Sequence, residues 1–357
     1  MASFYEATFV HLNTAGLLSE NAMAKTIATV RAIAVSAMVL VSSLSPSNSY
    51  AAPQPGCEGR SLIAELSLKR PAGVASLLEN ARQAENSQAI LWRIERHGIS
   101  PSYVLGTLHI AHPSLQELSP AVTSAITASR VVALEQEQLS RGAYGHVMAQ
   151  AGKLMSARDK PLQRMLDDSE LRVVEKAIAA AGYPEDLALG VRPWVATLFL
   201  AAGCPNVTHE PMDLIVANFA KSQGKKIVGL ETLLEQFETL ASIPDEAQAA
   251  WLRSSIEMND RADDVTATML ELYKGRQISA SLDLMRELAP NAGLTDARMQ
   301  DIRHGLITAR NVRMAERGLP LFETGGAFVA VGATHLPGAD GLISILKSSG
   351  FSVTPVE

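Results

Sequence analysis

The chain has 357 residues, 47% of them hydrophobic, and a formal net charge of −6 at pH 7. A chain of this length can bury a sizeable core as one large domain or as two. The acidic balance and the lack of a basic stripe argue against nucleic acid as the main partner, because nucleic-acid binding needs clustered cations to displace counterions.

The first 51 residues have the pattern of a cleaved secretory signal peptide. Lys25 and Arg31 form a positive region, and Ala32–Leu44 is a short apolar core. Small residues at Ser49 and Ala51 then match the pattern that signal peptidase recognises. We therefore expect cleavage after Ala51.

This leader predicts a periplasmic or secreted protein. Its apolar core is shorter than the roughly 18 residues of a spanning helix, which argues against the alternative of a retained membrane anchor, and no later apolar run is long enough to span. Met23 is an alternative start, because the residues before it do not resemble a charged lead-in. Both cysteines, Cys57 and Cys204, survive cleavage, and an oxidising compartment would allow them to pair or to remain free thiols.

The mature chain begins with an expected helical arm over residues 52–88, interrupted at Pro71, and continues as one domain over residues 89–357. The segment Ala89–Arg96 alternates apolar and charged side chains, which indicates a strand. A turn and a second apolar run, Tyr103–His109, follow at once, so we expect a β-hairpin.

A helix and a buried strand are expected next. Ser119 is a capping residue and Pro120 suits the first helical position, so a helix is expected to run to Ser129. The apolar run Arg130–Glu135 then predicts a buried strand that returns parallel to the same sheet.

The middle of the chain is expected to be helical. Residues 140–202 have mostly helical periodicity, and Glu210–Thr232 indicates a helix followed by a short strand. A long helical stretch is expected over Leu233–Arg317, with breaks near Pro244, Gly275 and Pro290–Gly293. The chain then ends with a strand at Ala327–Gly332, a glycine-rich turn, a helix capped by Asp340 and stopped by Gly350, and a final strand.

Two segments have the same order of features. Tyr103–Glu135 and Phe328–Glu357 each give a strand, a Gly-x-x-His motif, a polar turn with proline, a helix and a strand. This weak repeat predicts an α/β fold with a pseudo-symmetric central mixed sheet, flanking helices and a large helical middle region. Because ligand crevices in such sheets lie outside the carboxyl ends of the strands, both motif histidines are expected at one edge.

The two histidines, His109 and His335, are the strongest candidates for chemistry. Each could act as a neutral metal ligand or as a general base, and the glycine three residues earlier allows a sharp bend or a close approach. Glu135 ends the neighbouring strand, so its carboxylate is expected at the same edge. Two histidines and a carboxylate form a divalent-metal site, whose bound water becomes a nucleophile. The alternative is a pair of hydrogen-bonded histidines that cap strand ends.

Four further polar positions have open roles. Arg310 and Asn311 lie on a predicted helix, where the arginine could clamp an oxyanion or carboxylate, or simply face solvent. Glu231 ends a strand and could brace the site or cap the next helix. Glu137, two residues after Glu135, could share the site or face solvent, and we favour solvent.

Together, these stretches resemble the TraB/GumN family, which includes the Tiki-type metalloproteases. The resemblance covers about Leu91–Val356 and depends on LWRIE, YVLGTLH, VVALE, VGLET, ARNVRMA and the C-terminal block FVAVGATHLPGADGLISILKSSGFSV. It implies a fold like that of erythromycin-esterase and ChaN-type proteins.

The resemblance also implies a metal-dependent, peptidase-like centre. By position, its residues are His109 with Gly106, His335 with Gly332, Glu135, and Arg310 with Asn311, where the glycines line the bound group. Manganese or cobalt is the implied metal, with zinc or iron as alternatives. The chain departs from the family at Ala309, where an acidic residue often precedes the arginine.

The leading hypothesis is therefore a periplasmic, metal-dependent hydrolase acting on a peptide or small-molecule substrate. One alternative is a metal-independent, esterase-like hydrolase in which His109 is the general base and Glu135 orients it. Another is a non-enzymatic haem- or metal-binding protein. A fourth is an accessory role in exopolysaccharide production, for which these residues offer no sugar-processing signature.

Overall fold

The computed structural model describes residues 59–136, 141–201 and 209–357. The predicted signal peptide, both cysteines and Glu137 lie outside these ranges, so the expectations about them stay predictions. Within the described ranges, no helix combines the length and the apolar character needed to cross a bilayer.

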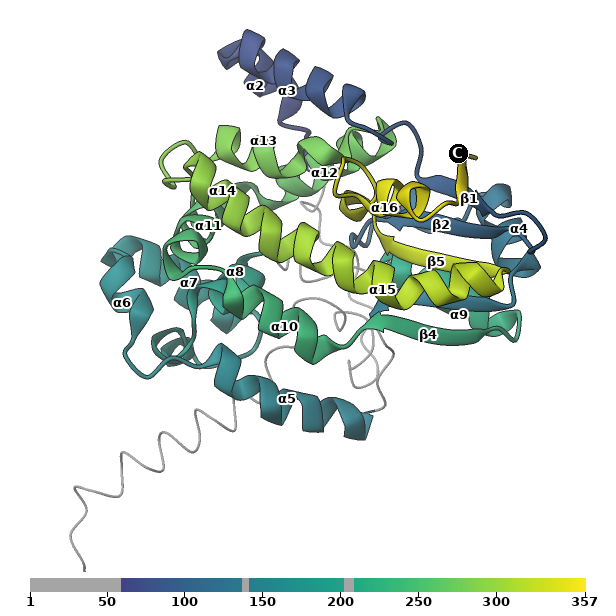
Figure 1. Cartoon of the computed structure of the whole chain (residues 1–357). Coiled ribbons are helices and arrows are strands. Elements are labelled where there is room, and N and C mark those ends of the chain that lie inside the picture. Colours follow the sequence, from purple (N-terminus) through teal and green to yellow (C-terminus); the bar gives the residue numbers. More distant parts are fainter. Residues whose placement is uncertain (1–58, 137–140, 202–208) are drawn as a thin grey trace, which may run out of the picture.

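A six-stranded mixed sheet organises the described residues, and helices surround it (Figure 1). The strand order is β4-β3-β5-β2-β1-β6, where the strands are β1 (Leu91–Glu95), β2 (Ser102–Thr107), β3 (Val131–Gln136), β4 (Lys226–Glu231), β5 (Ala327–Gly332) and β6 (Ser352–Pro355). Strands β4, β3, β5 and β2 are parallel, whereas β1 runs antiparallel to both β2 and β6. This confirms the predicted mixed α/β fold and the predicted hairpin.

The central strand β5 is buried along its whole length. Phe328 and Ala330 pack into the core on one face of the sheet, whereas Val329 and Val331 pack into the core on the other. Burial on both faces explains why this strand is a continuous apolar run rather than an alternating one.

Different helices cover the two faces. One core joins the sheet to α2 (Ile63–Lys69), α3 (Pro71–Gln83), α4 (Pro120–Ala128), α9 (Met212–Ser222), α12 (Ala262–Lys274) and α13 (Ser281–Leu288). The other joins it to α15 (Ala309–Thr324) and α16 (Leu342–Ser348). The predicted N-terminal arm therefore shares the core of the sheet, through residues such as Leu66 and Val74.

The predicted helical middle forms a third core beside the sheet. Its helices are α5 (Arg141–Met155), α6 (Pro161–Met165), α7 (Asp168–Ala180), α8 (Pro193–Leu200), α10 (Leu233–Ser242), α11 (Asp245–Glu257) and α14 (Asp296–Arg303). Short 3-10 helices connect several elements: η1 (Pro113–Leu115), η2 (Glu185–Gly190), η3 (Asn259–Arg261), η4 (Ile278–Ala280) and η6 (Ala333–His335). In Figure 1 this lobe extends away from the strands on the side where α10 and α15 leave the sheet.

Most predicted helix boundaries agree with the structure. Helices end just before Pro244, at Lys274 before Gly275, and at Leu288 before Pro290. The last long helix instead continues past Arg317 to Thr324 and contains Pro320. A π-helical segment, η5 (His304–Thr308), joins α14 to α15.

One capping prediction was wrong. The helix after the second motif begins at Leu342, and its N-cap is Gly341 in an extended conformation without a side-chain cap. Asp340 therefore does not cap it. The helix start is held instead by backbone contacts, since Ile345 donates to the Gly341 carbonyl.

The two Gly-x-x-His motifs lie on adjacent parallel strands, with Thr107 paired to Gly332. The internal symmetry is approximate, because β3 returns beside β5 whereas β6 returns at the far edge, next to β1. After β2 the chain passes His109 before reaching η1, whereas after β5 it enters η6 at once. Adjacent strands nevertheless deliver both histidines to one edge of the sheet.

Candidate functional site

The carboxyl ends of β3, β5 and β2 bring Glu135 between the two motif histidines. Its Oε2 lies 3.4 Å from Nε2 of His109 and 4.0 Å from Nε2 of His335. The His335 ring and the Glu135 carboxylate are buried, whereas the His109 side chain is 51% exposed. The structure thus places the three predicted donors together, with His109 on the open side.

His335 is held in one tautomer by Asn311. The Asn311 amide donates from Nδ2 to the backbone carbonyls of His335 and Asp340, at 3.3 and 2.7 Å. Its Oδ1 must therefore accept from Nδ1–H of His335, 2.7 Å away. Burial and the nearby Arg310 lower the pKa of His335 to about 3. The ring is neutral, and the lone pair on its Nε2 is directed towards Glu135.

His109 is oriented by a carboxylate rather than an amide. Asp213, in the first turn of α9, places Oδ2 2.6 Å from Nδ1 of His109. The other oxygen of Asp213 accepts from the Thr107 hydroxyl at 2.6 Å. The negative charge of Asp213, followed by that of Glu135, raises the pKa of His109 well above its usual range. The two histidines therefore have opposite electrostatic surroundings.

Glu135 remains a carboxylate although it is buried. Burial alone would raise its pKa, but Arg310 and His109 outweigh this effect and hold the pKa well below its usual value. Its Oε1 accepts from Nη2 of Arg310, and its Oε2 accepts from the Gly332 backbone N–H at 2.8 Å. Oε1 thus has Arg310 as its partner, whereas Oε2 accepts from Gly332 and also lies 3.4 Å from Nε2 of His109.

Arg310 is anchored beneath the site by Glu231. Glu231 is 1% exposed and accepts from Nε and Nη2 of Arg310 at 2.8 and 2.7 Å. Arg313, one turn further along α15, donates to the other Glu231 oxygen at 2.8 Å. Arg310 therefore does not lie on a solvated helix face, and Glu231 braces the site. Although Ala309 replaces an acidic residue, the arginine is anchored.

Gly332 leaves room beside the donors. Its φ of −51° is open to any residue, so backbone conformation does not require glycine there. A Cβ at this position would instead lie 3.1 Å from Nε2 of His109 and 3.3 Å from Oε2 of Glu135. A side chain at residue 332 would fill the space between the donor atoms.

Gly106 has a different role from the one expected. A Cβ on Gly106 would lie 2.8 Å from the Leu336 side chain and 2.9 Å from Cα of Ala333. The carbonyl of Gly106 accepts from the buried hydroxyl of Tyr273 at 2.9 Å. Gly106 thus lets η6 pack closely on β2, and its contacts are with the protein rather than with the donor atoms.

The donor set suits a divalent cation in its chemistry. Asp213 and Asn311 hold the Nδ1 atoms of the two imidazoles, so both Nε2 atoms face the carboxylate of Glu135. Metal-ligating histidines are commonly oriented in this way, by a partner on the nitrogen that does not bind the metal. Gly332 leaves open the space that a side chain would fill. Within the described ranges, no group of three or more His, Cys, Asp or Glu side chains has the spacing of a preassembled metal site. The fit therefore depends on donor type and orientation.

Three residues of this network were not predicted from the sequence: Asp213, Thr107 and Arg313. The sequence marks Asp213 only weakly as a functional residue, because it is simply an acidic residue in the first helical turn after a proline. Thr107 lies inside the first motif. His112, close to the first motif in sequence, lies outside the donor set, and its side chain caps the 3-10 helix η1.

A protein-family model matches most of the chain. The TraB/PrgY/gumN family model matches residues 90–355, which includes every strand of the sheet and all residues of the site. No curated protein and no solved structure gives a significant match. Because the family model covers well over half of the chain, the protein belongs to the TraB/PrgY/gumN family.

Proposed function

We propose that this protein is a metal-dependent hydrolase of the periplasm or the secreted fraction, with a peptide bond as its target. The observation that carries the proposal is the pair of lone pairs on His335 Nε2 and Glu135 Oε2, which face each other across 4.0 Å. Neutral imidazole and carboxylate are both acceptors there, so a cation between them would satisfy both. Gly332 leaves space for that cation.

In this proposal His109, His335 and Glu135 hold the ion. A divalent cation bound there would lower the pKa of a water molecule enough to supply hydroxide at neutral pH. By family resemblance manganese or cobalt is the proposed metal, with zinc or iron as alternatives. The substrate approaches from the side of His109, whose ring is half exposed.

The other polar residues position the donors. Asn311 fixes the tautomer of His335, and Asp213 fixes the orientation of His109. Arg310 makes hydrogen bonds to both Glu135 and Glu231, so its main task is to keep Glu135 ionised and in place. We accordingly assign Arg310 to the support of Glu135 rather than to a substrate clamp.

A second candidate function needs no metal. Asp213, His109 and Glu135 form a chain in which His109 lies 2.6 Å from one carboxylate and 3.4 Å from the other. Because the two carboxylates raise the pKa of His109, the ring is suited to act as a general acid, and it could act as a general base on water only after it loses its proton. Activity that is unchanged by a chelator would favour this candidate.

Metal content tests the proposal directly. The mature protein is purified without chelator, supplied in turn with manganese, cobalt, zinc and iron, dialysed and analysed for bound metal. We expect about one ion per chain in wild type and at least a tenfold loss in His335→Ala. His97→Ala is the matched control, because His97 is exposed in the β1–β2 turn at the opposite edge of the sheet.

Hydrolysis of a mixture of unstructured peptides is measured on the same samples. We expect it in metal-loaded wild type and in His97→Ala, and we expect its loss in His335→Ala. Wild type that retains none of the four metals, or a His335→Ala variant that retains metal and activity, would disprove the metal-dependent function.

A further inference from the structure

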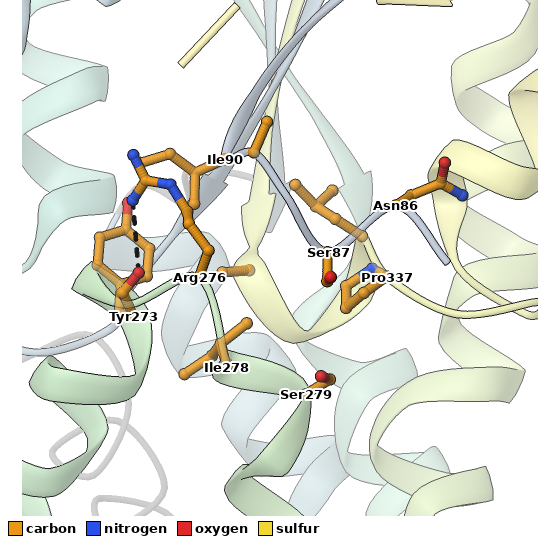
Figure 2. A pocket seen from close by; sticks show the side chains of 11 residues that line it. Asn86, Ser87, Ile90, Tyr273, Arg276, Ile278, Ser279 and Pro337 are labelled. Carbon is orange, nitrogen blue, oxygen red and sulfur yellow. Dashed lines mark hydrogen bonds between the residues drawn. The ribbon is translucent and has the colours of Figure 1, made fainter. Parts of the chain in front are cut away.

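A cavity lies beside the turn that carries His335. It has a volume of about 220 Å³ and lies between η4 and α13, the π-helical segment η5, and the loop 334–340. The neighbouring pocket drawn in Figure 2 shares Ser279 and Pro337 with it but has a volume of about 10 Å³, which is room for about one water molecule. Only the larger cavity could hold a substrate group.

The cavity is connected to the proposed centre through two residues. Asn311 lines it and also holds Nδ1 of His335. Thr334 lines it and lies inside the Gly-x-x-His motif, next to His335 in η6. The loop beyond is fixed to the same network, because Asn311 donates to the backbone carbonyl of Asp340. None of the three donor residues lines the cavity, so it is linked to the centre through Asn311, on the Nδ1 side of His335, and through Thr334.

The π-helical segment shapes one wall. Gly305 packs so closely on Ile243 that a Cβ there would lie 2.5 Å from the isoleucine side chain. With Gly305 against α10, the residues on the other side of the segment, Ile307 and Thr308, line the cavity. Such π-helical turns occur frequently at functional sites.

Three hydroxyl groups in the wall have unused hydrogen-bonding capacity. In helices of this chain, Thr and Ser hydroxyls commonly donate to the carbonyl four residues earlier, as Thr197 and Thr266 do. By contrast, the hydroxyls of Ser281, Thr308 and Thr334 make no hydrogen bond to another residue of the described ranges. Each of them could therefore offer a hydrogen bond to a polar ligand group.

The wall contains one cationic and one anionic side chain, Arg303 and Asp340. Arg303 is already paired, since its Nη2 lies 3.2 and 3.3 Å from the two carboxylate oxygens of Asp283. Asp340 lines the cavity and has no ion pair with any described residue. An unpaired carboxylate and neighbouring free hydroxyls can accept from an ammonium group, which has three donors and no acceptor.

From this combination we propose that the cavity is a specificity subsite for a lysine side chain of the substrate. The inference rests on the proposed function, since it supposes a peptide at the adjoining centre. The apolar walls formed by Leu282, Ile307 and Pro337 would contact the methylene stem, while the carboxylate and hydroxyls take the charged end.

The test compares peptides that differ only in one residue, lysine or its uncharged near-isostere norleucine. Each is labelled with a fluorophore, and both binding by anisotropy and cleavage are measured with the metal-loaded protein. We expect the lysine peptides to bind 3- to 10-fold more tightly than the norleucine peptides. In Asp340→Asn this ratio should fall to nearly one.

The matched control is Asp186→Asn, which removes the same charge at an exposed position of η2 in the helical lobe and should leave the ratio unchanged. Equal binding of the two peptides by wild type, or an unchanged ratio in Asp340→Asn, would overturn the subsite. Lysine-selective binding without cleavage of any peptide would support the subsite and contradict the hydrolase proposal, so the two failures are distinguishable.

Discussion

The Nδ1 atom of His109 lies 2.6 Å from a carboxylate oxygen of Asp213, a residue 104 positions away in the sequence. The corresponding atom of His335 lies 2.7 Å from the amide oxygen of Asn311. One motif histidine is therefore supported by a charged partner at an open position, and the other by a neutral partner in the interior. The two motifs are alike in sequence but not in their electrostatic surroundings.

Replacing Asp213 by Asn tests the support of His109. The substitution keeps the size of the side chain but removes the charge that raises the pKa of His109. We expect the pKa of His109, measured by NMR titration of the metal-free protein, to fall, and metal affinity to drop about 10- to 100-fold. Thr107→Val is the control, since it removes only the hydrogen bond to Asp213. An unchanged His109 pKa in Asp213→Asn would show that the contact does not form in solution.

Substitution of the two motif glycines by alanine should have opposite consequences. In Gly332→Ala the backbone tolerates a side chain, so the free energy of unfolding should change by less than about 1 kcal/mol. The new Cβ intrudes between the donors, so bound metal should be lost. In Gly106→Ala the Cβ collides with Leu336 and Ala333, which should cost about 1–3 kcal/mol of stability. Denaturant unfolding and metal analysis of both variants measure the contrast. Metal retained by Gly332→Ala would contradict the proposed site.

Glu231 should be important for stability as well as for the site. Its carboxylate is the shared partner of Arg310 and Arg313, and replacing it by Gln leaves two guanidinium groups undercompensated in a buried setting. Breaking such a buried ion pair costs about 3–5 kcal/mol, and urea unfolding should show a loss in this range. Glu79→Gln is the comparison, because Glu79 pairs with Arg82 on the exposed surface and its loss should cost about 1 kcal/mol or less. Equal losses in the two variants would show that burial of Glu231 is unimportant.

Mild acid should destabilise the metal-free protein through His335. In the folded state its pKa is about 3, whereas in the unfolded chain it is about 6.5. Between these values only the unfolded state takes up the proton, so stability is full above pH 6.5 and falls as the pH decreases towards 3. At pH 5 this group alone lowers the free energy of unfolding by about 2 kcal/mol relative to pH 7. His335→Gln should show a smaller loss between pH 7 and pH 5 when the two proteins are unfolded in urea. An identical pH dependence would mean that His335 is not buried in its neutral form.

Local sequence patterns were sufficient to predict much of the fold. The alternation of Trp92 and Ile94 with charged neighbours predicted β1, and the Ser119–Pro120 start signal predicted α4. These signals depend on hydrogen bonds and burial patterns within a few residues. The prediction failed where a distant contact intervened. Asp340 looks like a helix cap, but its carbonyl is used by Asn311 and the helix begins after Gly341.

The candidate site was only partly predictable for the same reason. His109, His335 and Glu135 follow apolar strands, so strand order in a sheet places them at one edge. Asp213 and Arg313 carry no strong motif, because their roles arise from where α9 and α15 pack. The two glycines illustrate the limit most clearly: both precede a motif histidine, yet Gly332 leaves space at the donors and Gly106 leaves space for a turn.

The sequence by itself determined the elements, the burial of the central strands and the delivery of two histidines and a carboxylate to the ends of neighbouring strands. These follow from side-chain periodicity and short-range backbone chemistry. Only the tertiary structure decided that His335 is neutral, that Glu135 stays ionised and that Arg310 is buried between two glutamates. Such properties depend on burial and on charges contributed by residues far apart in the chain, and spacing along the sequence does not encode distance in space.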